Sequence, residues 1–249
     1  MPHSTSDHFG GKTVPEHIKE ARIKGMQASA EIHGTEISGY KAAFADSLRD
    51  TSLAMALIAE VSFTLLPNPK AFLLTLLFLV GWMIWKTCRS SLLGWARLER
   101  LHRLIEEERW EIQHHRPQER EELMELYQSK GFEGDLLTEV INVLMADDNR
   151  LLEVMLIEEL GLPLEAYEHP LKQAFGSFLG SFIAVILGSA FYFLIPSYGF
   201  LVAAFPLFLA GGIWTAKIER IKILPSLIWN MSVFGLTIGF IYFTKEFLR

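Results

Sequence analysis

Residues that can bind a metal ion, mostly glutamates, recur in pairs at helical spacing through the middle of the chain. Residues three or four positions apart share one face of a helix. Three such pairs carry metal-ligand side chains: Glu108 and Glu111, Glu119 and Glu122, and Met155 and Glu159. Two glutamates at this spacing repel each other and weaken a bare helix by roughly a few tenths of a kcal/mol. A bound cation reverses the sign of that effect, so the spacing favours a divalent-metal site built by three helices.

The chemical types of the ligand side chains limit which metals would suit such a site. Carboxylates suit hard divalent ions, whereas a thioether such as that of Met155 favours softer transition metals. The alternative interpretation is that the glutamates form solvated helix faces, and that Met155 packs in a core. Arg109, Arg116 and Arg120 are near enough in sequence to neutralise some of the acids. Spacing alone leaves both interpretations open.

The six residues lie in an acidic block that spans about residues 98–162. Between residues 99 and 168 stand 19 of the chain's 29 Asp and Glu, but only 7 of its 23 Lys and Arg. Pro117 suits the first turn of a helix, and Gly131 is expected to end that helix. Asp147 or Asp148 can cap a later helix, which is expected to stop at Gly161. The block is therefore predicted to be a small helical domain.

Apolar segments flank the acidic block on both sides. Half of the 249 residues are hydrophobic, and the mean hydropathy is +0.24. A helix needs on the order of 20 mostly apolar residues to cross a bilayer. The sequence predicts five such helices, at about residues 43–66, 70–85, 175–195, 200–216 and 225–243. The predicted fold class is an all-α membrane protein with five transmembrane helices, and with the helical metal-binding domain between helices two and three.

Basic residues at the helix ends predict the orientation in the membrane. Lys86 and Arg89 follow the second predicted span, and Lys217, Arg220 and Lys222 precede the last one. Because cytoplasmic loops carry an excess of Lys and Arg, the N-terminus and the acidic block are expected in the cytosol. The predicted domains are an N-terminal cytosolic arm (1–41), helices one and two (42–90), a cytoplasmic metal-binding domain (91–170) and helices three to five (171–249).

Composition and the N-terminal segment argue against other classes of protein. A net charge of −6 argues against nucleic acid as a partner. A single cysteine makes neither an intrachain disulfide nor a cysteine-based zinc site. Four histidines at positions 3, 8, 17 and 33 match no metal-ligand spacing, so this segment is interpreted as a solvated arm. No prosthetic group is expected.

Two pairs of glycines stand four residues apart in the predicted membrane helices. They are Gly176 with Gly180, and Gly235 with Gly239. Small residues at this spacing let helix backbones approach closely. The contacts that they make lie either within one subunit or between subunits.

Two sequence stretches carry a family resemblance. HRPQEREELMELYQSKGF, followed by LLEVMLIEELGL, resembles the cytoplasmic metal-binding domain of the vacuolar iron and manganese transporter family. The likeness covers about residues 98–162, and the order of the predicted helices is also similar. The resemblance implies a homodimer in the lipid bilayer, not an enzyme, that exports Fe²⁺ or Mn²⁺ from the cytosol by proton exchange. The divalent metal is then the substrate.

The resemblance also assigns the metal ligands. Carried over residue by residue, they fall on Glu108, Glu111, Glu119, Glu122, Met155 and Glu159. In the family a second methionine follows the first, where this chain has Leu156. The spacing from the proline to Glu119 is one residue shorter than in the family, which makes Glu107 an alternative to Glu108.

The first two predicted spans depart from the family's pattern. An Asp-Gly motif is typical of the first span, but here neither Asp46 nor Asp50 is followed by Gly. In the second span, LVGWMIWKTCRSS keeps Met83 and lacks the family's Glu, while Lys86 lies nearby. An ionisable residue inside a membrane helix is a functional candidate, so Glu60 is predicted to line the transport path with Asp50 and Met83. The alternative is that these acids have structural roles at the interface or in a dimer contact.

These departures keep a second function open. A non-transporting membrane protein would retain the acidic domain as a membrane-anchored metal sensor, buffer or scaffold. Binding of metal without flux across a membrane would distinguish this alternative from a transporter.

Overall fold

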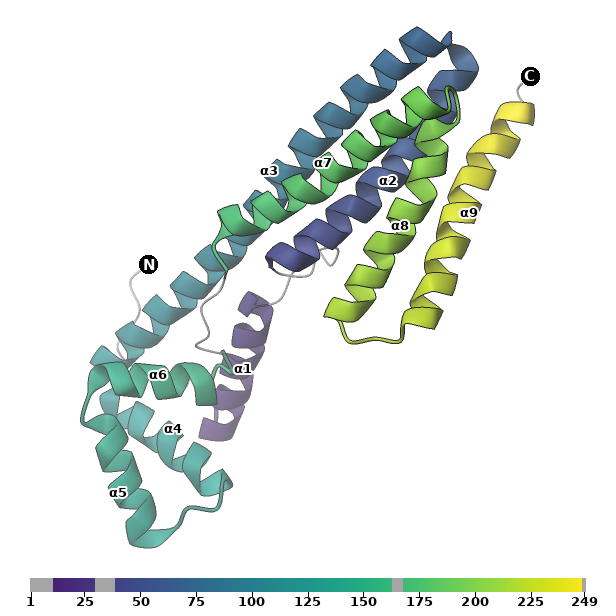
Figure 1. The fold of residues 1–249 in the computed structure, drawn as a ribbon. Helices are drawn as coiled ribbons and strands as arrows, with labels where there is room; N and C mark the ends of the chain where they lie inside the picture. The colour runs from purple at the N-terminus through teal and green to yellow at the C-terminus, as the bar shows by residue number, and fades with distance from the viewer. Residues whose placement is uncertain (1–10, 30–38, 163–167, 248–249) are drawn as a thin grey trace. The chain divides into compact units, whose positions relative to one another are not determined.

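The protein is helical throughout the part of the chain that the computed structural model describes, residues 11–29, 39–162 and 168–247. No strand occurs among these residues. The helices (Figure 1) are α1 (Val14–Ser29), α2 (Tyr40–Leu65), α3 (Asn68–His114), α4 (Arg116–Ser129), α5 (Gly134–Met145), α6 (Asp148–Glu158), α7 (Pro170–Leu194), α8 (Gly199–Ile218) and α9 (Ile223–Phe247). The predicted all-α class is thus confirmed.

The chain divides into two compact units, here named the acidic unit and the apolar unit. The acidic unit comprises Met1–Ile32 and Ala96–Tyr167, and the apolar unit comprises His33–Trp95 and Glu168–Arg249. Helices α1, α4, α5 and α6 belong to the acidic unit; α2, α7, α8 and α9 belong to the apolar unit. The long helix α3 contributes its last part to the acidic unit and the rest to the apolar unit.

Local sequence signals set the helix ends in the acidic unit. Pro117 lies in the first turn of α4, and Gly131, with φ of 92°, makes the turn after that helix. The side chain of Asp147 caps α6 by accepting a hydrogen bond from the backbone N–H of Arg150 at 2.8 Å. These helices share a hydrophobic core whose buried members include Leu101, Ile112, Leu123, Ile141, Leu151 and Met155.

Helix α1 packs within the acidic unit, so the prediction that the N-terminal segment is a solvated arm is wrong for this helix. Ile18 and Ala21 are buried. Gly25 lies so close to the end of α6 that an added Cβ would lie 2.0 Å from the carbonyl oxygen of Leu160. Arg22 Nη2 donates a hydrogen bond to the carbonyl oxygen of Glu158 at 2.6 Å. Apolar and small residues at helical spacing therefore fix one face of α1 against the unit.

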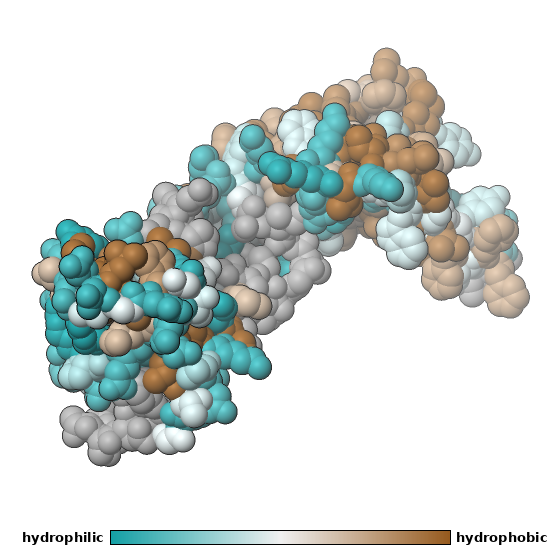
Figure 2. Space-filling model, turned by 90° about the horizontal axis from the view of Figure 1, so that it is seen from below, coloured by the Kyte–Doolittle hydropathy of each residue, from teal (hydrophilic) through white to brown (hydrophobic). Residues whose placement is uncertain are grey.

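The apolar unit has the character of a membrane domain. Within the described residues, α3, α7, α8 and α9 are long and apolar enough to cross a membrane. Helix α2, the first of the five predicted spans, is not among these four, and it contains Asp46, Asp50 and Glu60. Leu236 and Phe240 of α9 are 74% and 70% exposed, which suits contact with lipid. Hydrophobic surface gathers over this unit, whereas the visible surface of the acidic unit is mainly hydrophilic (Figure 2).

Helix α2 packs most extensively against α7 and α8. An added Cβ at Gly176 or Gly180 of α7 would lie 2.3 Å from a backbone carbonyl oxygen of α2. This glycine pair therefore brings two helices of one chain together. At Gly235 and Gly239 of α9, in contrast, a Cβ would meet nothing within 4 Å among the described residues.

Candidate metal centre

The structure gathers the predicted carboxylates inside the acidic unit. Glu108 of α3, Glu119 and Glu122 of α4, and Glu159 directly after α6 are only 4%, 1%, 1% and 2% exposed. Buried acids are rare unless they are neutralised or bind a metal. The alternative of solvated helix faces therefore does not describe these four side chains.

Three of the buried carboxylates can share one ion. Glu108, Glu119 and Glu159 each offer an oxygen atom, and these atoms all lie within 4.8 Å of one another. The Oε1 atom of Glu108 is buried and has no hydrogen-bond partner among the described residues. Glu108 is the member of this group, whereas the alternative Glu107 is exposed and lines the small cavity beside it.

Helix geometry explains why these particular glutamates meet. Glu119 lies in the first turn of α4, where the helix dipole favours a negative charge. Glu159 follows the last turn of α6, and its backbone N–H donates to the carbonyl oxygen of Met155 at 2.9 Å. The hydrophobic core holds α3, α4 and α6 together through residues such as Ile112, Leu123 and Leu151.

Burial makes the cluster hold protons. Burial, and next the charge of Glu108, raises the pKa of Glu119 to about 11. Burial also raises the pKa of Glu122, to about 7, while a hydrogen bond from Glu159 acts in the opposite direction. The pKa values of Glu108 and Glu159 are raised well above 4.5, again mainly by burial. Since a cation and a proton compete for the same oxygen lone pairs, this cluster is suited to exchange one for the other.

The remaining two predicted ligands, Glu111 and Met155, have different surroundings. Glu111 is half-buried, and its charge helps to raise the pKa of Glu108 and of Glu159. Met155 is fully buried and belongs to the hydrophobic core, one turn before Glu159. Glu111 lines the small cavity beside the cluster, whereas the burial of Met155 in the core agrees with the alternative that its side chain packs there.

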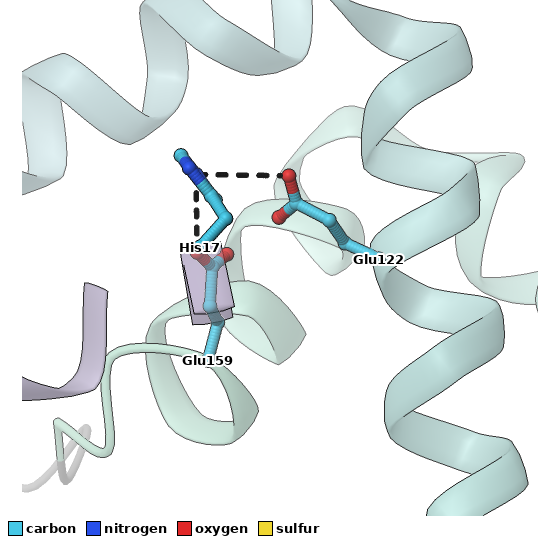
Figure 3. Close-up of side chains that lie close together, drawn as sticks. All are labelled: His17, Glu122 and Glu159. Atoms are coloured by element: carbon cyan, nitrogen blue, oxygen red, sulfur yellow. Dashed lines mark ion pairs between the residues drawn. The ribbon is translucent and has the colours of Figure 1, made fainter. Parts of the chain in front are cut away.

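A histidine that the spacing did not single out lies beside the cluster. Nε2 of His17 in α1 lies 3.7 Å from Oε1 of Glu122 and 3.8 Å from Oε1 of Glu159 (Figure 3). His17, Ala21 and Gly25 are four residues apart in sequence, so they share one face of α1. That periodicity is the signal in the sequence that indicates docking of this helix, but it does not name the docking partner.

A small cavity opens among these side chains. Its volume is about 20 Å³, and its lining includes His17, Lys24, Glu108, Glu111 and Glu159. A space of roughly 10–15 Å³ is enough for one water molecule, so this cavity has room for a single small ion.

A Glu-x-x-His pattern in the acidic block does not add its histidine to the cluster. This spacing, present at Glu111 and His114, is typical of di-iron sites in helix bundles. His114 is exposed, stacks on Trp110 and has Nδ1 2.8 Å from the carbonyl oxygen of that residue. Its ring is therefore engaged outside the cluster.

The predicted path residues are distributed along the apolar unit and are not gathered at one point. Asp50 and Glu60 are ten residues apart in α2, about 15 Å along a helix axis. Asp50 Oδ2 pairs with the ammonium of Lys86 at 3.0 Å, and Glu60 pairs with Lys245. Met83 of α3 is half-buried and precedes Lys86 by three residues. Each acid thus already has a cationic partner from its own chain.

Asp50 also borders a larger cavity with a mixed polar and apolar lining. This cavity of about 410 Å³ lies among α2, α8 and α9. Asp50 of α2, Thr215 of α8 and Asn230 of α9 line it together with apolar side chains such as Phe208 and Trp229. It gives the charged end of α2 access to space within the apolar unit.

Fold and sites together define an all-helical integral membrane protein with a compact acidic unit that contains buried carboxylates. A family model described as the VIT family matches residues 96–244. The chain therefore belongs to the VIT family, that of the vacuolar iron transporters, and the resemblance noted in the sequence is confirmed. Members of this family transport metal ions. A search of curated proteins found no match to the chain.

The family model covers the candidate metal ligands but not the candidate path residues. It includes all six predicted metal ligands of the acidic unit. It begins after α2 and after the apolar part of α3, so Asp50, Glu60 and Met83 lie outside it.

Proposed function

We propose that this protein is a divalent-metal transporter that exports Fe²⁺ or Mn²⁺ from the cytosol, and that its acidic unit binds the ion before transport. The observation that carries this proposal is the burial of Glu108, Glu119 and Glu159, from three helical elements, with oxygens within 4.8 Å of one another. Such a group of carboxylates matches the preference of hard divalent ions for oxygen. Family membership supports metal-ion transport in general.

Protons are the proposed counter-ions. The raised pKa of Glu122, about 7, places one protonation step within reach of the cytosolic pH. When a divalent ion binds, the cluster releases protons, because the ligands must be deprotonated. A thioether ligand from Met155, which lies one turn before Glu159, would favour transition ions over Mg²⁺ and Ca²⁺.

The proposed topology has five membrane spans, namely α2 together with the four apolar helices α3, α7, α8 and α9. The packing of α2 against α7 and α8 supports this placement. In addition, Asp50 pairs with Lys86 of α3, and Glu60 pairs with Lys245 of α9. Basic residues near the acidic unit and near the α8–α9 turn support a cytosolic N-terminus and acidic unit. The protein is proposed to act as a homodimer, as the resemblance implies.

The proposed path leads from the acidic unit to Asp50, Glu60 and Met83. The cavity of about 410 Å³ beside Asp50 supports an entry at the charged end of α2. For Asp50 to receive an ion, its pairing with Lys86 has to open.

The rival function is that of a membrane-anchored metal sensor, buffer or scaffold without transport. One observation favours it: Asp50 and Glu60 are neutralised by Lys86 and Lys245 of the same chain. An acid that is paired in this way has less electrostatic attraction left for a passing cation.

Calorimetric titration of the purified full-length protein with Mn²⁺ tests the binding step. We expect Glu119→Gln combined with Glu122→Gln to weaken binding by about 100-fold or more, because even outer-shell changes at metal sites cost about 10- to 100-fold. The matched control is Glu121→Gln combined with Glu125→Gln, which removes two exposed acids from the same helix. Equal titrations for the two double variants would overturn the proposal.

A further inference from the structure

Two overlapping groups of ligand atoms lie in the acidic unit. One is the all-carboxylate group of Glu108, Glu119 and Glu159 described above. The other consists of His17, Glu122 and Glu159, whose ligand atoms also all lie within 4.8 Å of one another. Glu159 belongs to both groups. A carboxylate shared in this way is the usual bridge of sites that hold two ions about 3.5–4 Å apart.

We infer that His17 is a metal ligand supplied by the N-terminal helix, and that it forms a second cation position with Glu122 and Glu159. This inference rests on the proposed function, since it adds a position to the same cluster. An imidazole nitrogen favours first-row transition ions, Mn²⁺ among them, over Mg²⁺, whereas an all-oxygen group suits Mn²⁺ and Mg²⁺ equally. The ion that the second position takes is therefore a first-row transition ion.

The distances from His17 to the two carboxylates suit an ion shared among the three side chains. Its Nε2 lies 3.7 Å and 3.8 Å from the two carboxylate oxygens, beyond normal hydrogen-bond length. Two ligands held about 2.1 Å from one metal at angles of 90–120° lie roughly 3.0–3.6 Å apart. A movement of a few tenths of an ångström would thus bring His17 to coordination distance of an ion held between it and the two acids.

The position of His17 is built by the packing of α1 and does not depend on a mobile surface side chain. Its side chain is only 16% exposed. One turn and two turns further on, Ala21 is buried and Gly25 touches the backbone of Leu160. The hydrogen bond from Arg22 to the carbonyl of Glu158 fixes α1 next to Glu159 itself. The ion-sized cavity borders His17 and Glu159 together.

A simpler role for His17 is that of a protonated ion-pair partner for the two acids. This role predicts a charge beside the cluster but no bond between nitrogen and metal. The two roles therefore differ in a spectroscopic signature that a purely electrostatic or structural contribution does not produce.

The test uses the full-length protein saturated with Mn²⁺, whose electron spin echo is modulated by a directly bound ¹⁴N nucleus. We expect ¹⁴N modulation in the wild type and in His102→Gln, which changes an exposed histidine of α3. In His17→Gln we expect the modulation to disappear and calorimetry to count one Mn²⁺ fewer per chain. Persistent modulation in His17→Gln, or no modulation in the wild type, would overturn the inference.

A further variant separates this inference from the proposed function. If Glu119→Gln lowers Mn²⁺ binding while His17→Gln leaves both the ion count and the modulation unchanged, the carboxylate site stands and the histidine position falls. If the wild type binds no Mn²⁺ in the acidic unit, both fall. Circular dichroism of His17→Gln shows whether α1 has unfolded, and in that case His102→Gln and the wild type still decide whether nitrogen is bound.

Discussion

Four carboxylates that share a protein interior must be neutralised by protons or by cations. In the metal-free protein protons do this, because burial raises the pKa of Glu119 to about 11 and that of Glu122 to about 7. Metal binding then replaces protons at the same oxygens. At the scale of single residues, the cluster is therefore an exchanger of protons for divalent ions.

The raised pKa values make the metal-free protein less stable as the pH rises. The folded protein retains protons that the unfolded chain loses above its ordinary pKa of 4.5, so the stabilisation is complete below about pH 4.5 and is lost as the pH rises through the folded pKa of Glu122, about 7. A difference of this size corresponds to at most about 3 kcal/mol for that group. Urea unfolding of the acidic unit's helices in the metal-free protein, followed between pH 5 and 8, measures the slope.

Two comparisons check the origin of that slope. Glu122→Gln removes the titrating group, so its slope should be shallower than that of the wild type, whereas Glu121→Gln, an exposed neighbour, should match the wild type. Stability that stays constant or increases over this range would show that the cluster does not hold protons in the folded state.

At the scale of elements, helix contacts decide which small residues matter. Gly180 of α7 lies against α2, where a Cβ would come within 2.3 Å of the carbonyl oxygen of Phe44, while a Cβ at Gly239 of α9 would meet nothing described within 4 Å. We expect Gly180→Ala to destabilise the protein by about 1–3 kcal/mol through overpacking. Gly239→Ala should change the stability little.

Thermal melting of the two variants in one detergent measures this difference. A melting temperature for Gly180→Ala equal to that of Gly239→Ala would contradict the close packing of α2 against α7. If Gly239→Ala alone alters the oligomeric state, the free face of α9 is a subunit contact.

The sequence predicted elements better than it predicted contacts between them. Pro117, Gly131 and Asp147 act through local backbone geometry, so their effects on helix ends were predictable from neighbouring residues. The glutamate spacing predicted shared faces but not which acid of a run is buried, and only the packed structure distinguishes Glu108 from Glu107.

Contacts between segments that are far apart in the chain could not be predicted from local sequence signals. The docking of His17 depends on a contact between Gly25 and Leu160, which are far apart in the chain. Likewise, the pairing of Asp50 with Lys86 joins two different helices. No periodicity within one segment specifies such partners, and this is why the N-terminal helix was interpreted as a solvated arm.

At the scale of the whole molecule, the proposal joins two tasks in one chain. The acidic unit has a buried carboxylate cluster, and the apolar unit has the helices of an integral membrane protein. A sensor or buffer needs only the first task, whereas a transporter also needs the ion to cross the apolar unit. The neutralised acids of α2 make this second task the more demanding one.

Mn²⁺ uptake into sealed proteoliposomes, with the internal pH recorded at the same time, tests the central claim most directly. The account predicts that the wild type accumulates Mn²⁺ while protons move in the opposite direction. It also predicts that Glu119→Gln combined with Glu122→Gln loses most of this flux and that Glu121→Gln combined with Glu125→Gln retains it. Tight Mn²⁺ binding by the wild type without uptake or a pH change would contradict transport and leave the protein a membrane-anchored metal binder.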